Sequence, residues 1–162
     1  MADDIRQKIM DEVVVRFTTI TTANGYETNI GSSVSLWRDL KSTPLVGDEP
    51  DAVNIMDVTT LTDKSNQPVG TALHTMEIRA EAATQDTSMA RDKKVRKMLA
   101  DMVKAIGTDR KWTVSGTTLA WDTSIESSEI DVEQGGEIVG QCQLVFNILY
   151  RTLDFDPYNE RH

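Results

Sequence analysis

Residues 76–82 read Met-Glu-Ile-Arg-Ala-Glu-Ala, and this stretch decides the fold. Glu77, Arg79 and Glu81 alternate with apolar residues, and a period of two is typical of a strand with one apolar and one charged face. The whole strand is expected over residues 71–83, after a second β-rich stretch at 53–61. Asn, Pro and Gly mark the connection between them. The sequence therefore predicts an antiparallel hairpin whose tip, around residues 62–70, projects from the body.

Apolar residues at helical spacing predict two helices. In residues 4–20 an apolar residue recurs every four positions, from Ile5 to Phe17. The second helix is expected over 89–106, directly after the hairpin. Asp86, Thr87 and Ser88 offer N-caps for it, and Gly107 is expected as its C′ stop; its apolar stripe comprises Val95, Met98, Leu99, Met102, Val103 and Ile106.

The remaining pattern predicts further strands. Residues 142–150 alternate in the same way, and shorter strands are expected at 26–30, 34–36, 112–114 and 119–125. Residues 41–51 carry two prolines and predict a loop. We expect one α+β domain over 1–152, with a largely antiparallel (mixed) β-sheet of about six strands and two main helices on one face. Residues 153–162 are expected to form a flexible tail.

Composition narrows the class of protein. The chain has 162 residues and a formal net charge of -9. It has no apolar run near the ~20 residues that a membrane helix needs. Nucleic-acid affinity depends largely on Lys and Arg contacts to phosphates, so an acidic chain argues against specific DNA or RNA binding. A cytoplasmic origin fits the single cysteine, Cys142.

Few residues offer chemistry. Cys142 lies in a strand pattern that favours a buried thiol over a nucleophile, and the histidines are His74 and His162. These spacings match no zinc motif. Asp48, Glu49 and Asp51 form an acidic cluster that we interpret as a solvated loop rather than a Ca²⁺ site. Three tryptophans (Trp37, Trp112 and Trp121) are interpreted as packing residues rather than a ligand platform. We therefore expect no enzyme, with no catalytic, cofactor or metal site.

Charge is segregated along the second half of the chain. Residues 91–111 contain eight basic residues, namely Arg91, Lys93, Lys94, Arg96, Lys97, Lys104, Arg110 and Lys111. Residues 112–150 contain no Lys or Arg but six acids, namely Asp122, Glu126, Glu129, Asp131, Glu133 and Glu137. Two interpretations stay open. The charges belong to a solvated helix face beside an acidic loop, or they form complementary patches between identical subunits, which is a heterologous contact that closes into a ring.

The order of elements resembles the tail terminator proteins of long-tailed (siphovirus) phages, in the lambda-like minor tail protein family. The resemblance rests on the helix at 5–17, the hairpin of 53–61 with 71–83, the helix at 89–106 directly after it, and the closing strand Leu-Val-Phe-Asn-Ile-Leu-Tyr-Arg-Thr at 144–152. It covers most of the chain. The acidic segment 126–137 has no counterpart that we can place in the family.

The resemblance implies a virion protein, assembled in the bacterial cytoplasm, that forms a homohexameric ring at the head-proximal end of the tail tube. Such a ring stops tube polymerisation and receives the head. Its partners are other copies of itself, the major tail tube protein and the head–tail connector protein, and DNA passes through its lumen without specific binding. We expect the subunit and tube interfaces to use Arg91, Lys94, Arg96, Lys97, Asp63, Lys64, Glu126, Glu129, Asp131 and Glu133.

Three alternatives stay open. The nearest is another head–tail joining or tail completion protein. A small enzyme using Cys142, His74 or the acidic cluster at 48–51 is the second. The third is a cytoplasmic ligand-binding domain with a tryptophan-lined pocket.

Overall fold

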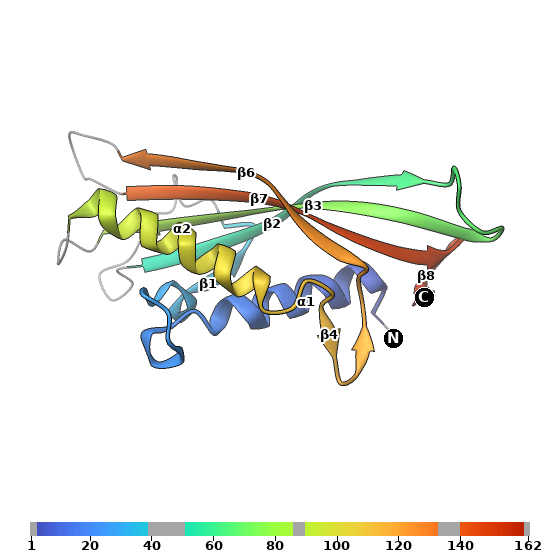
Figure 1. The fold of residues 1–162 in the computed structure, drawn as a ribbon, viewed down its shortest axis with the longest axis horizontal. Coiled ribbons are helices and arrows are strands. Elements are labelled where there is room, and N and C mark those ends of the chain that lie inside the picture. Colours follow the sequence, from blue (N-terminus) through green and yellow to red (C-terminus); the bar gives the residue numbers. More distant parts are fainter. Residues whose placement is uncertain (1–2, 39–50, 86–89, 133–139, 161–162) are drawn as a thin grey trace.

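In the computed structural model, which describes residues 3–38, 51–85, 90–132 and 140–160, a long twisted sheet lies over two α-helices (Figure 1). The helices are α1 (Ile5–Thr18) and α2 (Arg91–Gly107). The strands are β1 (Val34–Leu36), β2 (Asp51–Asp63), β3 (Thr71–Thr84), β4 (Thr113–Val114), β5 (Thr117–Thr118), β6 (Asp122–Val132), β7 (Gly140–Leu153) and β8 (Asp156–Glu160). Short 3₁₀ turns lie at Thr22–Asn24 and Ile30–Ser32. The chain is thus α+β, as the sequence predicts.

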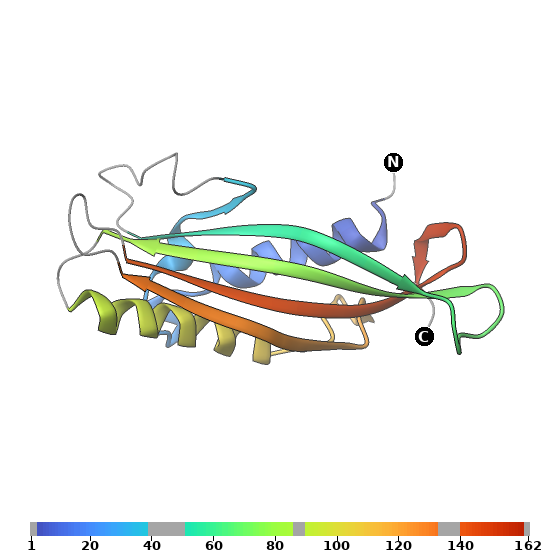
Figure 2. The same cartoon turned by 90° about the horizontal axis from the view of Figure 1, so that it is seen from above.

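The main sheet is mixed, with strand order β1-β2-β3-β7-β6, and β8 pairs with the end of β7. β1 runs parallel to β2, whereas the other pairs are antiparallel. The predicted hairpin is confirmed, since β2 and β3 pair along their length and their connection extends beyond both helices (Figure 1). Seen from above, β2 and β6 run along the two sides of the sheet (Figure 2).

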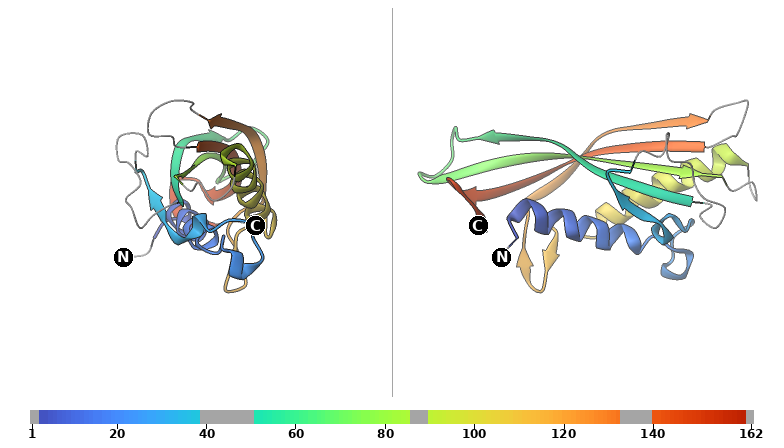
Figure 3. Two further views of the ribbon diagram at one scale, coloured as in Figure 1. Left: turned by 90° about the vertical axis from the view of Figure 1, so that its left-hand side faces the viewer. Right: turned by 180° about the vertical axis from the view of Figure 1, so that it is seen from behind.

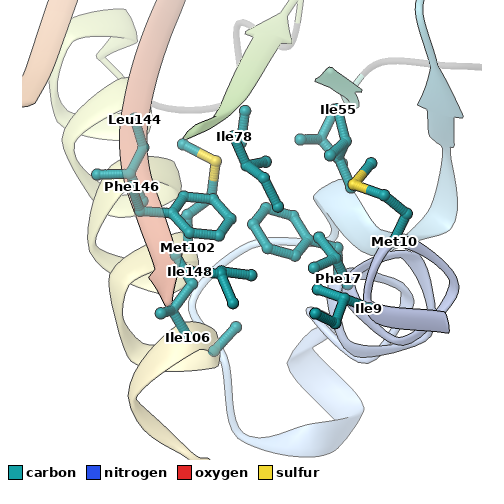
Figure 4. Packing of buried hydrophobic residues seen from close by; sticks show 14 of the residues in the cluster. Ile9, Met10, Phe17, Ile55, Ile78, Met102, Ile106, Leu144, Phe146 and Ile148 are labelled. Atoms are coloured by element: carbon teal, nitrogen blue, oxygen red, sulfur yellow. The ribbon is translucent and has the colours of Figure 1, made fainter. Parts of the chain in front are cut away.

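Both helices pack on one face of this sheet, as predicted. The sheet curls over them when the molecule is viewed end-on (Figure 3). A single hydrophobic cluster contains buried residues of α1, α2, β2, β3 and β7. Its centre is a stack of rings in which Phe146 lies 6.5 Å from Phe17 and 6.4 Å from Trp112, between centroids (Figure 4 shows Phe17 and Phe146). The alternation in β3 and β7 supplies the apolar side chains that fill this layer.

Four local expectations are corrected. Residues 26–30 form no strand; the chain instead makes the Ile30–Ser32 turn, where Gly31 lies against the end of α1 so closely that a Cβ would sit 2.6 Å from the Phe17 carbonyl oxygen. Gly107 is the last residue of α2 rather than its C′ stop, and Thr108 caps the helix in a right-handed conformation. The proposed N-caps at 86–88 and most of the predicted loop at 41–51 lie outside the described residues, although Asp51 opens β2.

The last two corrections concern segments in which the alternation of apolar and polar residues is weak. The acidic stretch expected as a loop is a strand over residues 126–132, because β6 pairs with β7 up to Val132. The expected flexible tail is, over residues 153–160, the end of β7 followed by β8, which turns back onto β7. Asp154 donates its backbone N–H to the Gly70 carbonyl, which ties this turn to the hairpin.

Candidate interaction surfaces

The cations of α2 divide into buried and exposed sets. The apolar stripe of α2 packs on β3, β6 and β7, and Lys94 lies on the edge of that stripe. Lys94 Nζ is 2.9 Å from Asp51 Oδ2, and both side chains are less than a tenth exposed. Asp51 also accepts a hydrogen bond from the Thr84 hydroxyl. Lys94, which we predicted for the interface, is therefore neutralised inside the chain.

Two outward-facing cations of α2, Arg96 and Lys97, also have partners within the chain. Arg96 pairs with Asp92 at 2.7 Å, one helical turn away, and Lys97 Nζ is 2.6 Å from Glu27 Oε2. These hydrogen bonds lower the pKa values of Asp92 and Glu27. Arg91 is half-buried where α2 meets the start of β7. Of the predicted interface cations on α2, Arg96 and Lys97 are the two that reach the surface, and both pairs are exposed enough to exchange partners.

The acids of β6 present a different surface. Glu126, Glu129 and Asp131 are exposed on the outer face or edge of the sheet, and Glu133 lies outside the described residues. Glu126 sits at a bulge between Ile125 and Ser127 and accepts a hydrogen bond from Asn147. Glu129 and Asp131 have no ion pair with any described residue. Together with Glu81 they line a shallow recess of about 100 Å³.

The strand register places the two charged surfaces on opposite faces of the sheet. Glu129 lies opposite Gln143, which lies opposite Glu81, and residues directly opposite one another point to the same face. The neighbouring Leu144 points the other way, into the core that α2 covers. The exposed cations of α2 and the acids of β6 therefore cannot pair within one subunit. Asp122, the first residue of β6, binds Arg110 at 2.8 Å, but Arg110 lies after the end of α2.

The hairpin tip is held by contacts to the β7–β8 turn. Asp63 accepts hydrogen bonds from the backbone and hydroxyl of Ser65, which lower its pKa. Lys64 binds Asp154 at 2.5 Å and lies over the Phe155 ring. Both predicted tip residues are thus at the surface and partnered within the chain. Phe155 itself is 92% exposed, which leaves an apolar side chain on this projection.

His74 lies in a recess of about 290 Å³ beneath the same tip. Its ring stacks on Tyr150 at 4.8 Å between centroids, and its two nitrogens contact the hydroxyls of Thr62 and Thr152. Burial, with a smaller effect of Lys64, lowers the pKa of His74, so the neutral form is favoured. His74 is thus a half-buried histidine whose ring nitrogens both have hydroxyl partners.

The residues of the enzyme alternative do not meet. Cys142 pairs across the sheet with Ala82 of β3, which lies eight residues after His74 in the same strand. At the rise of a strand, Cys142 and His74 are therefore roughly 26 Å apart along the strand direction. Cys142 is buried, as predicted, and burial raises its pKa to about 12. Of the cluster at 48–51, Asp51 is bound by Lys94, and Asp48 and Glu49 lie outside the described residues.

The three tryptophans are also spread over the molecule. Trp112 is fully buried, donates its indole N–H to Thr123 and lies under the Arg16 guanidinium. Trp37 follows β1 at one edge of the sheet, whereas Trp121 precedes β6 at the other, where Arg151 lies over its ring. The predicted packing role is confirmed for Trp112. Trp37 and Trp121 are exposed at the surface, and the three do not line one pocket.

Sequence reasoning missed the buried ion pair and the exposed edge residues. A signal for the first was available, since Lys94 lies four residues before Met98 on the buried stripe. Asp101, three residues after Met98, is buried in the same way and accepts hydrogen bonds from the backbone N–H groups of Glu27 and Thr28. No comparable signal marks Trp37 or Phe155, because their exposure depends on where β1 and β7 end.

Within the described ranges, no three His, Cys, Asp or Glu residues gather in a way that would hold a metal ion. Neither described helix has the length and apolar character needed to cross a membrane. In comparisons with known proteins, no protein-family model matches the chain and no curated sequence matches it significantly.

Proposed function

We propose that this chain is a structural assembly protein of a phage tail. It forms a ring at the head-proximal end of the tail tube, stops tube growth and offers the surface to which the head joins. The observation that carries this proposal is the placement of two charged surfaces on opposite faces of one sheet. One holds the exposed cations of α2, and the other holds Glu129 and Asp131 of β6, which pair with no described residue. Opposite charges that cannot meet within a subunit are available to meet between subunits.

Such a contact is heterologous, because one surface of a copy meets a different surface of the next. Repetition of a heterologous contact gives a ring when the rotation closes. Charges in the contact set its register and speed its formation, while the neighbouring apolar residues supply most of the affinity. The projecting hairpin suits a second contact along the tail axis, toward the tube.

The outer face of the sheet suits the lumen. Glu77, Glu81, Glu129 and Asp131 outnumber Arg79 and Arg151 on this face, which neither helix covers. A net negative wall repels the DNA backbone and keeps passing DNA from sticking.

Electron microscopy of a lysate from phage lacking this chain tests the proposal. We expect tail tubes longer than those of the parent phage and without heads, because nothing ends polymerisation. Tails of normal length that are not attached to heads would instead indicate a head–tail joining protein. Normal virions would contradict both functions.

A further inference from the structure

We propose that neighbouring copies of this chain join by strand pairing, with the free edge of β6 in one copy against the free edge of β2, residues 57–63, in the next. The inference rests on the ring of the proposed function and gives it a contact other than the direct meeting of α2 and β6. A sheet continued by this pairing keeps α2 and the acids of β6 on opposite faces around the whole ring.

Both edges are open in the part of the chain that the structure describes. β6 is eleven residues long and pairs on one side only, with β7. β2 is covered by β1 at Val53–Ile55, where the pairing ends with the Trp37 N–H bound to the Ile55 carbonyl. From Met56 onward β2 pairs only with β3. Edges of this length present unpaired N–H and C=O groups to another strand.

Strand direction favours a heterologous pairing. β2, β3, β7 and β6 are four successive antiparallel strands, so β2 and β6 run in opposite directions. When copies are related by rotation about an axis along the strands, every β2 points the same way. β6 of one copy then meets β2 of the next in antiparallel fashion, and the alternation continues around the ring.

Both edges also carry exposed apolar side chains. At the β2 edge these are Trp37, Val58 and Leu61, and at the β6 edge they are Trp121, Ile125 and Ile130, each at least 39% exposed. Trp37 has a φ of 55°, a left-handed conformation that is uncommon for a bulky residue, and its indole donates to Asp57. These contacts hold an aromatic ring at the position where β1 ends, and buried aromatic anchors often dominate interface energies.

The charges disfavour pairing of β6 with itself. β6 carries four acids, Asp122, Glu126, Glu129 and Asp131, and no cation, so two antiparallel copies would set acids against acids. Residues 57–63 carry two acids. Asp57 is bound by Arg6, and Asp63 accepts hydrogen bonds from Ser65.

Two bulges bound the segments that can pair. One leaves Val58 outside the β2 ladder, and the other leaves Glu126 outside the β6 ladder. Continuous pairing is therefore limited to residues 59–63 against either 122–125 or 127–132. Thr59 and Ser124 are exposed and lie in one row across the sheet, through Glu77 and Asn147. If neighbouring copies are not shifted along the strand direction, Thr59 of one copy therefore lies opposite Ser124 of the next.

Disulfide trapping with the purified full chain tests the contact. Each β2 substitution, Thr59→Cys or Leu61→Cys, is combined with Ser124→Cys or Ser127→Cys, which samples both segments of β6 at exposed positions on the same face of the sheet. Under mild oxidation we expect at least one of these four double variants to give a ladder of dimers and higher oligomers on a non-reducing gel. A disulfide within one copy is excluded, because three strand spacings of ~4.8 Å separate the two edges.

The wild type and the four single variants are the controls. Cys142 is buried and will not react, so the wild type stays monomeric on the gel. Dimers of a Ser124→Cys or Ser127→Cys single variant in the same yield as the ladder would show β6 pairing with itself and overturn the inference. The absence of an intermolecular disulfide in all four double variants would also overturn it. That result together with overlong tails in the lysate would reject the strand contact and leave the terminator function standing.

Discussion

The helix α2 and the strand β6 carry the two halves of the charge segregation, yet the fold uses their charges differently. On α2, Lys94 is buried against Asp51, and the exposed Arg96 and Lys97 each bind an acid of the same chain. On β6, Glu129 and Asp131 are exposed and unpaired among the described residues. The cations of α2 thus help to hold the monomer together, whereas the acids of β6 add little to it.

This difference separates charge that supports the fold from charge that is available to a partner. A run of like charges in the sequence does not distinguish the two, because burial and pairing are decided by the packing of distant segments. Asp51 and Lys94 are far apart in the chain, and they meet only because β2 and α2 lie on the same side of the molecule. Substitutions matched across the two regions test how far this comparison holds.

The largest loss of stability is expected from Lys94→Met. This change leaves the Asp51 carboxylate buried without its ammonium partner, and breaking a buried pair in this way costs about 3–5 kcal/mol. Lys93→Met is the matched control, because Lys93 is exposed and makes no ion pair with a described residue. The control should change the free energy of unfolding by no more than about 0.5 kcal/mol. Urea denaturation followed by circular dichroism measures both.

The double variant Lys94→Met/Asp51→Asn sharpens this result. Removing the stranded charge should recover part of the loss, since the amide is less costly to bury than a carboxylate. A loss below about 1 kcal/mol in Lys94→Met alone would mean that this helix cation is as dispensable as those at the surface.

An intermediate loss is expected from Gly140→Ala, where α2 packs on the start of β7. A Cβ at this position would lie 2.6 Å from Val95 Cγ2 and 2.8 Å from Arg91 Cγ, so the helix must shift. Overpacking of this kind costs about 1–3 kcal/mol. Gly107→Ala is the matched control at the other end of the same helix, since a Cβ there meets nothing within 4 Å. Thermal unfolding should separate the two, and equal melting temperatures would contradict the close packing of α2 on β7.

Periodic segments of the sequence predict most of this fold. The strands β2, β3 and β7 and both helices follow from alternation or helical spacing, because each buries one face and leaves the other polar. The prediction fails where pairing, rather than periodicity, decides the structure. β6 beyond the bulge carries acids on its outer face and only isolated apolar residues on its inner one, such as Ile130, so the sequence reads as a loop. β8 is a short strand fixed by the Asp154–Gly70 hydrogen bond and its pairing with β7.

The candidate surfaces are predicted less completely than the fold. The sequence identifies both charged regions but not which cations face solvent, and it groups the buried Lys94 with the exposed Arg96. Placement of the regions on opposite faces follows from the register of β6 on β7, which depends on a bulge at Glu126. A bulge of one residue reverses which side chains point outward, and no residue in this stretch indicates where the bulge lies.

The smallest change in stability, and the most direct test of the comparison, is expected from reversing exposed charges on each region. Arg96→Glu/Lys97→Glu breaks two solvent-exposed ion pairs, which contribute little to stability, so the monomer should stay folded. Glu129→Lys/Asp131→Lys breaks no ion pair among the described residues and should leave the free energy of unfolding unchanged or slightly raised.

If the two surfaces meet between copies, each reversal alone should reduce assembly, measured by light scattering and by joining of tails to heads. Combining all four substitutions should restore part of it, because the charges are again opposite. Unchanged assembly in both double variants would show that the segregated charge only solvates the surface. Loss that the combination does not rescue would place each surface against a different partner rather than against the other.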